Sequence, residues 1–253
     1  MKEFYIKDDG IDLHAKLETP EGFTHGPVAI VFHGLTGHME EDHIVGVTHT
    51  LLSLGIATLR VELFGHGKSG GDFFDHTLYK WVSNGLRVVD YVRGLDFVDE
   101  IFCVGHSQGA LLTILLAGMV PDHLAAIAPL SPAVSIIEIA RTGRFFDVEF
   151  DPDHVPDVFS FHDKPISGNY IRVAQTIDVN RAIDAYAKPV LIVHGTEDTA
   201  VDVSFGIAVA KRYENAELVL VEGDDHCFHR HLDKALDAVG DFFRRQLERG
   251  TCH

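Results

Sequence analysis

One serine of this chain stands in a pattern that suits nucleophilic chemistry. Residues 101–112, IFCVGHSQGALL, run from an apolar strand-like segment through Gly105-His106-Ser107-Gln108-Gly109 into an apolar helix-like segment. The two glycines allow the sharp strand-to-helix turn that exposes a serine hydroxyl at the top of a sheet. The same turn leaves the Gln108 N–H facing the space where a substrate oxygen would lie. We therefore predict Ser107 as nucleophile and the Gln108 N–H as a donor to an oxyanion.

A serine hydroxyl needs a base, and that base needs an acid to orient it. After this kind of turn the three residues follow in the chain order Ser, then Asp or Glu, then His. Two stretches fit, because each follows an apolar strand-like segment: residues 194–198, HGTED, and residues 222–226, EGDDH. Ligands of open α/β sheets bind at the carboxyl ends of the strands, where both stretches would lie. We assign Asp198 as the orienting acid and His226 as the general base.

Several neighbours compete for these two roles. Glu197 is adjacent to Asp198, and Asp202 is an alternative acid that could instead cap the following helix. His229 and His231 compete with His226 but lie in or near the next helix. Three imidazoles can also bind zinc, although no carboxylate pattern accompanies them here. We expect no metal and no cofactor.

A second oxyanion donor is expected from the loop after an early strand. That loop reads Phe-His-Gly-Leu-Thr-Gly over residues 32–37, and the Leu35 N–H is the natural donor, with His33 bracing the loop. Residues 65–71, GHGKSGG, contain G-x-G-x-x-G but no first βαβ unit frames them, so we predict a structural loop and no dinucleotide site. Cys227 is expected to be a packing neighbour of His226.

The elements that must position these residues alternate along the chain. Residues 3–7 and 11–18 read as an antiparallel hairpin around Asp9-Gly10. Continuous apolar runs predict buried strands at residues 28–32, 57–61, 101–104, 125–128, 190–193 and 218–221. Apolar stripes at steps of three and four predict helices over 78–92 and 232–247. Strands alternating with helices indicate an α/β fold, a mostly parallel central sheet flanked by helices.

The alternation stops between residues 132 and 182, where prolines, aromatic residues and acids gather. A connection of this size usually forms a lid or a binding segment. We predict an α/β core of residues 1–131 and 183–253 with residues 132–182 inserted as a cap, or lid. The alternative is an insertion that only shields one edge of the sheet.

Composition excludes some classes of partner. The chain has 253 residues and a formal net charge of −17, which repels nucleic acid and anionic membranes. The charged start MKEFYIKDDG does not resemble a signal peptide, and Cys103, Cys227 and Cys252 lack metal-site spacing, so we expect a cytoplasmic protein. No motif encodes the oligomeric state, for which a homodimer is one option.

The motifs together resemble the α/β-hydrolase superfamily along nearly the whole chain: His33-Gly34, residues 62–69, residues 105–109, residues 195–198 and residues 223–226. The GHSQG pentapeptide, the DHCF stretch at 225–228, and residues 151–157 and 169–175 further resemble the bacterial cinnamoyl or feruloyl esterases. Ala110 departs from that family, which often has a glycine there; this leaves the catalytic assignment intact.

The narrower resemblance implies an α/β-hydrolase fold whose short cap covers the serine and holds the ring of a hydroxycinnamate ester. It implies that Tyr170 contacts the phenolic hydroxyl and that Glu138 supplies the acidic cap residue for it. Phenylalanines of the cap are expected to build mainly its own small core, with one or two facing substrate: Phe145, Phe146, Phe150, Phe159 and Phe161.

The expected activity is therefore that of a serine carboxylesterase acting on a small aromatic ester. A short-chain esterase or acylglycerol lipase with the same triad is the second hypothesis. The cap of such a lipase would form an apolar tunnel. A binding protein that keeps the fold without turnover is the third, and it usually lacks one member of the triad.

Overall fold

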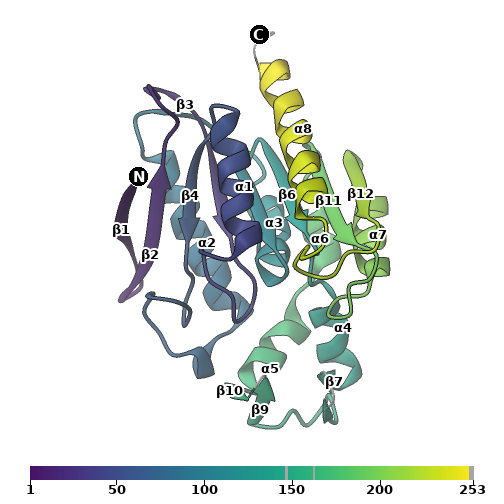
Figure 1. The fold of residues 1–253 in the computed structure, drawn as a ribbon. Helices are drawn as coiled ribbons and strands as arrows, with labels where there is room; N and C mark the ends of the chain where they lie inside the picture. Colours follow the sequence, from purple (N-terminus) through teal and green to yellow (C-terminus); the bar gives the residue numbers. More distant parts are fainter. Residues whose placement is uncertain (146–147, 162, 251–253) are drawn as a thin grey trace.

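An eight-stranded sheet forms the centre of the molecule in the computed structural model, which describes residues 1–145, 148–161 and 163–250 (Figure 1). Its strand order is β1-β2-β4-β3-β5-β6-β11-β12, and only β2 runs against the others. The strands are β1 Lys2–Asp8, β2 Ile11–Glu18, β3 Gly26–Phe32, β4 Ala57–Val61, β5 Val98–His106, β6 Ala126–Leu130, β11 Val190–Gly195 and β12 Ala216–Val221. All six apolar runs predicted from the sequence are strands of this sheet. The prediction of burial is wrong for β12, where Leu218 and Leu220 are exposed because this strand lies at the edge of the sheet.

The N-terminal hairpin is confirmed. β1 pairs antiparallel with β2 from Lys2 opposite Leu17 to Asp8 opposite Ile11. Asp9 and Gly10, between the strands, both have positive φ, 43° and 81°. Two-residue hairpin loops need this conformation because it matches the twist of the flanking strands. The hairpin forms one edge of the sheet through pairing of β2 with β4.

Helices cover both faces of the sheet (Figure 1). Two of them pack on one face: α1 Asp42–Ser53 and α8 Leu232–Gly250. Four contribute to the other: α2 Leu78–Arg93, α3 Gln108–Met119, α6 Val179–Asp184 and α7 Val203–Arg212. A 3-10 turn, η1 Phe73–Asp75, precedes α2. The two predicted helices are α2 and α8.

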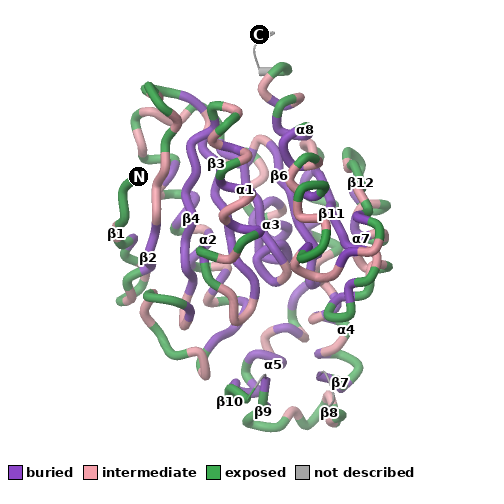
Figure 2. Tube along the Cα trace, viewed as in Figure 1, coloured by how far each residue is buried: buried purple, intermediate pink, exposed green. Residues whose placement is uncertain are grey.

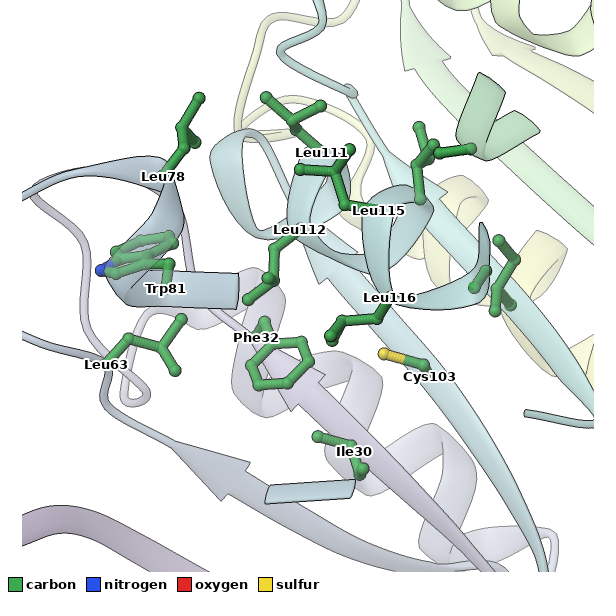
Figure 3. Packing of buried hydrophobic residues seen from close by; sticks show 14 of the residues in the cluster. Ile30, Phe32, Leu63, Leu78, Trp81, Cys103, Leu111, Leu112, Leu115 and Leu116 are labelled. Carbon is green, nitrogen blue, oxygen red and sulfur yellow. The ribbon is translucent and has the colours of Figure 1, made fainter. Parts of the chain in front are cut away.

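The central strands β3, β5, β6 and β11 supply both cores, because successive side chains point to opposite faces. In β3, Ile30 and Phe32 enter the core under α2 and α3, whereas Ala29 and Val31 enter the core under α1 and α8. Figure 3 shows Phe32 beside Leu112 and Leu116 of α3. Apart from the first three residues of β5, these strands are accordingly almost wholly buried (Figure 2). This double coverage explains why their sequences are continuously apolar.

The segment between β6 and β11 lies at the carboxyl ends of the strands, below the sheet in Figure 1. It contains α4 Ser135–Thr142, α5 Asn169–Thr176, α6, and two short hairpins, β7 Arg144–Phe145 with β8 Val148–Glu149 and β9 Val158–Phe161 with β10 Lys164–Ser167. The sequence indicated the break in the alternation but not α4 or α5. Of the residues between 132 and 182 that the structure describes, none belongs to a strand of the central sheet. Within the described ranges, no helix has the length and apolarity needed to cross a bilayer.

Candidate active site

Ser107 lies at the turn between β5 and α3 in a backbone conformation that non-glycine residues rarely adopt, with φ 56° and ψ −119°. Its N–H donates to the Leu130 carbonyl at 2.9 Å, which helps to fix this conformation. The flanking glycines are required by space: a Cβ on Gly105 would lie 2.1 Å from the Gly109 carbonyl oxygen, and a Cβ on Gly109 would lie 2.4 Å from that of His33. The turn therefore needs both glycines of the pentapeptide.

The predicted acid and base are brought together from two strand ends. Asp198 follows β11 and His226 follows β12, and the His226 Nδ1 lies 2.6 Å from Asp198 Oδ2. The other carboxylate oxygen accepts the backbone N–H groups of Ala200 and Val201, both at 2.8 Å. Because His226 donates its Nδ1 hydrogen to a carboxylate, its Nε2 is left as the acceptor that a general base needs. Ser107 and His226 line the same cavity.

The competing residues have other partners. Glu197 forms an ion pair with Arg230, and Asp202 accepts the Ser204 N–H at 2.9 Å as the cap of α7. His229 pairs with Asp225 at 2.9 Å and is exposed, and the His231 N–H donates to Asp224 at 3.1 Å. None of these four lines the cavity that contains Ser107.

His194 lies against Asp198, a contact that the sequence analysis did not predict. Its fully buried ring lies with Nε2 3.0 Å from the same Asp198 Oδ2 that receives His226. Burial of Asp198 opposes its ionisation, but the hydrogen bonds from His194 and His226 outweigh burial and hold the pKa of this carboxyl well below its usual range. The sequence offered one indication of this contact: His194 is the next-to-last residue of β11, four residues before Asp198.

The loop expected to supply the second oxyanion donor lies directly against the nucleophile. A Cβ on Gly34 would be 3.0 Å from the Ser107 Cβ. His33 accepts the Leu63 N–H at 3.2 Å and so donates through Nδ1 to the Gly34 carbonyl at 2.7 Å. Leu35 and Gln108 both line the cavity, and Gln108 begins α3, where N–H groups lack intrahelical acceptors. His33 braces this loop, as predicted; the donors Leu35 and Gln108 stay predictions.

Burial keeps several histidines near the site neutral. We call them the buried histidines: His33, His43, His66, His76 and His106. Burial lowers the pKa of His33 to about 3 and those of His43 and His66 to about 4, and it takes the pKa values of His76 and His106 well below the usual range. A neutral ring can accept a hydrogen bond at one nitrogen and donate at the other. His66 accepts the Thr36 N–H at 3.0 Å, and His106 Nε2 lies 2.8 Å from the His226 carbonyl.

The glycine-rich segment after β4 is the structural loop that the sequence predicted. It folds around the carboxylate of Glu62, which accepts the Lys68 N–H at 2.6 Å and lies 2.8 Å from His14 Nδ1. A Cβ on Gly67 would overlap this carboxylate at 1.9 Å. The loop is thus filled by a negative charge of the protein's own, which is the opposite of what a phosphate site requires.

The cavity beside Ser107 has a volume of about 260 Å³ and two chemically different ends. The inserted segment provides one end, with mainly apolar walls: Ala133, Ile136, Ile139, Phe145, Phe161 and Tyr170. The other end, beside His226, is lined by Thr36, Glu41 and Cys227. Phe150 and Phe159 pack on each other at 5.1 Å between ring centroids and do not line the cavity. Phe146 and Cys252 lie outside the described residues.

The two residues that the family resemblance implied as substrate contacts lie in different places. Tyr170, fully buried on α5, lines the cavity and donates its hydroxyl hydrogen to Gln108 Oε1 at 2.7 Å. Gln108 Nε2 in turn lies 2.8 Å from His76 Nε2, so this chain of bonds joins the inserted segment to the nucleophile turn. Glu138 is exposed on α4 and is not among the residues that line the cavity. The face of α4 that lines it carries Ser135, Ile136 and Ile139.

A strand-turn-helix serine, an acid and a histidine from two later strand ends, and this sheet topology together point to one family. The model of the alpha/beta hydrolase family matches residues 29–241. The chain belongs to the alpha/beta hydrolase family. Across the described part of the chain, no group of three His, Cys, Asp or Glu side chains is arranged to hold a metal ion.

Two solved structures of one member of this family are similar over nearly the whole chain. Est1E from Butyrivibrio proteoclasticus with ferulic acid bound is 48% identical, with 97% of this chain and 99% of that one covered and a TM-score of 0.95. A second structure of Est1E is 46% identical, with 98% of this chain and 100% of that one covered and a TM-score of 0.93. Among curated proteins, the monoglyceride lipase homolog of monkeypox virus is 26% identical over 84% of this chain and 87% of its own length.

Proposed function

We propose that this hydrolase is a serine carboxylesterase that cleaves hydroxycinnamate esters. One observation carries the proposal: the Asp198–His226 pair and Ser107 converge on a single cavity whose far walls are apolar and aromatic. Such a cavity suits a flat ring at one end and the ester carbonyl at the serine. The similarity to Est1E, which has been solved with ferulic acid bound, supports the same class of ligand.

The chemistry proceeds by transfer of an acyl group to the serine. His226 takes the proton of Ser107 as its oxygen attacks the ester carbonyl, and Asp198 stabilises the resulting imidazolium. The Leu35 and Gln108 N–H groups hold the oxyanion, each worth about 3 kcal/mol in the transition state. His226 then returns the proton to the leaving alcohol. Water, activated by His226 in the same way, hydrolyses the acyl-enzyme and releases the acid.

Tyr170 gives the apolar end a preference for phenols. Its own hydroxyl hydrogen is donated to Gln108, which leaves the oxygen lone pairs to accept a further bond. The phenolic O–H of ferulate or p-coumarate is a donor of the required kind. The inserted segment then acts as a cap that holds the ring. The exposed position of Glu138 does not support a contact with it, so the proposal assigns the phenol to Tyr170 alone.

An acylglycerol lipase is the second candidate, because the monoglyceride lipase homolog of monkeypox virus and the monoglyceride lipase of mouse are among the curated relatives, at 26% and 24% identity. The two candidates differ in the acyl group that the cavity takes. Initial rates on methyl ferulate, 4-nitrophenyl butyrate and 4-nitrophenyl palmitate separate them. We expect efficient cleavage of methyl ferulate, slow cleavage of the palmitate, and loss of nearly all turnover in Ser107→Ala. Preference for the palmitate would establish the lipase, and an active Ser107→Ala would refute the triad.

A further inference from the structure

The end of the cavity beside His226 carries a carboxylate that the proposed mechanism does not use. Glu41, the residue before α1, lines the cavity together with Thr36 and Cys227. Its side chain is 27% exposed. It lies across Gly37, where a Cβ would be 2.4 Å from Glu41 Oε2, and the same oxygen accepts the His38 N–H at 3.2 Å. The carboxylate is therefore held at this end of the cavity by the backbone of its own loop.

The charge of Glu41 is not neutralised by an ion pair with a lysine or arginine. Among the described residues, no Lys or Arg pairs with it, and the imidazole within ion-pair distance, His43 at 3.9 Å, is neutral because burial lowers its pKa to about 4. Burial raises the pKa of the Glu41 carboxyl, and the His38 N–H together with the nearby His38 and His226 rings opposes this rise. The adjacent Glu40 differs: it pairs with Lys16 at 2.8 Å and Arg60 at 3.3 Å and does not line the cavity. One loop thus presents a neutralised carboxylate outside the cavity and an unneutralised one inside it.

The catalytic step determines which half of an ester meets Glu41. His226 must deliver its proton to the leaving oxygen, so the alcohol half lies at the end of the cavity next to His226. The acyl ring then occupies the apolar end under the inserted segment. The alcohol half consequently contacts the end lined by Thr36, Glu41 and Cys227, where burial keeps the Cys227 thiol uncharged by raising its pKa to about 11.

We propose that Glu41 defines a leaving-group subsite that accepts neutral, hydroxyl-bearing alcohols, such as a pentose, and rejects alcohols that carry a carboxylate, such as quinate. This inference rests on the proposed esterase function. Hydroxyl groups donate hydrogen bonds to a carboxylate, whereas a second carboxylate is repelled strongly in a half-buried site. The formal charge of −17 adds repulsion of the same sign for the whole molecule.

A matched pair of substrates isolates this charge. Chlorogenate (caffeoyl quinate) and its methyl ester share the caffeoyl ring and the sugar-like alcohol and differ only in the carboxylate of the alcohol half. We expect kcat/KM for release of caffeate to be at least about tenfold higher for methyl chlorogenate in the wild-type protein. Glu41→Gln should bring this ratio close to one. Glu40→Gln, which removes an equal charge from the same loop but outside the cavity, should leave the ratio as in the wild type.

Two outcomes would overturn the proposal: a wild-type ratio near one, or an equal change of the ratio in Glu40→Gln and Glu41→Gln. If Glu41→Gln does not fold, as judged by circular dichroism and thermal melting, Glu41→Ala takes its place in the same comparison with Glu40→Gln. Failure of the esterase function is recognised separately, since methyl ferulate, whose leaving group is methanol, would then not be cleaved by the wild-type protein at all.

Discussion

The buried imidazole of His194 should be needed for catalysis although it does not line the cavity. Asp198 is fully buried and receives four hydrogen bonds: two from backbone N–H groups at 2.8 Å, one from His226 at 2.6 Å and one from His194 at 3.0 Å. His194→Leu removes one donor and keeps an apolar side chain of similar size. A hydrogen bond to a charged group is worth about 1.5–3 kcal/mol. We expect the free energy of unfolding to fall by about 2 kcal/mol.

The turnover number should also fall, because His194 helps to hold the carboxylate of Asp198. If about 1.4 kcal/mol of that loss appears in the transition state, where the carboxylate faces an imidazolium, kcat falls roughly tenfold. KM should stay unchanged, because His194 is not among the residues that line the cavity. The hydrogen bond from His194 also helps to hold the pKa of Asp198 low. Without it that pKa rises but stays low, because His226 and the two backbone N–H groups still donate to the carboxylate, so the loss of activity should be similar throughout the pH range of the assay.

The assay is kcat and KM for 4-nitrophenyl butyrate between pH 4.5 and 8, with folding checked by circular dichroism. His194→Gln supplies an N–H in nearly the place of Nε2 and should retain more activity than the leucine variant. Gly206→Ala should weaken the same hydrogen bond from the opposite side of the ring, because the new Cβ would lie 2.3 Å from His194 Nδ1 and must displace the imidazole. A folded His194→Leu with unchanged kcat across this pH range would refute the reasoning.

Four further predictions follow from single contacts. Tyr170→Phe should lower kcat/KM for methyl ferulate about tenfold and leave methyl 3,4-dimethoxycinnamate, which has no phenolic hydrogen, far less affected; equal losses on both esters would contradict the phenol contact. Gly109→Ala should cost more than about 3 kcal/mol in chemical unfolding, because its Cβ meets backbone oxygens at 2.4 and 2.7 Å, whereas Gly94→Ala, with its nearest contact at 3.5 Å, should be tolerated. Cys227 should react with iodoacetamide at pH 7.5 at least about 100-fold more slowly than a free thiol, since burial raises its pKa to about 11; peptide mass spectrometry measures this rate. The buried histidines have lowered pKa values in the folded state, so their contribution to stability is complete above pH 6.5 and is lost as the pH falls toward 4, each by up to about 1.4 kcal/mol per pH unit; guanidinium unfolding midpoints that do not change between pH 7 and 5 would exclude this.

The sequence predicted the parts of the molecule whose information is local. Ser107, Asp198 and His226 each follow a strand that an apolar run predicts, by one, three and five residues, and the sheet brings the ends of those strands together. The same local reasoning found the hairpin around Asp9-Gly10 and the capping role of Asp202. Several strand ends were underestimated, by up to three residues at the start of β5. In β11 the reason is that Gly195 and His194 are not apolar, although the sheet buries them.

Residues whose role depends on tertiary contacts were missed. His194 reads as one of 17 histidines, and only the folding of residues 194–198 back on themselves places its ring on Asp198. Glu41 belongs to no motif, although it stands four residues after the loop of residues 32–37, and it lines the same cavity as His226. Glu138 stays a prediction: its neighbours Ile136 and Ile139 line the cavity, whereas Glu138 itself is exposed on α4.

The inserted segment is continuous in sequence and crosses the sheet from one edge to the other. It leaves after β6 and returns before β11, which are parallel neighbours paired at Leu130 and Val193, so it starts at the carboxyl ends of the strands and finishes at their amino ends. The helix α6, packed on α3, completes this crossover. Ser107 precedes the segment in the sequence, and Asp198 and His226 follow it, so the part before α6 could be exchanged without changing any of these three residues. Such a graft would have to keep the crossover helix and replace the contacts of α5 with the core, among them the Tyr170 hydroxyl on Gln108 and the Thr176 hydroxyl 2.5 Å from that of Tyr79.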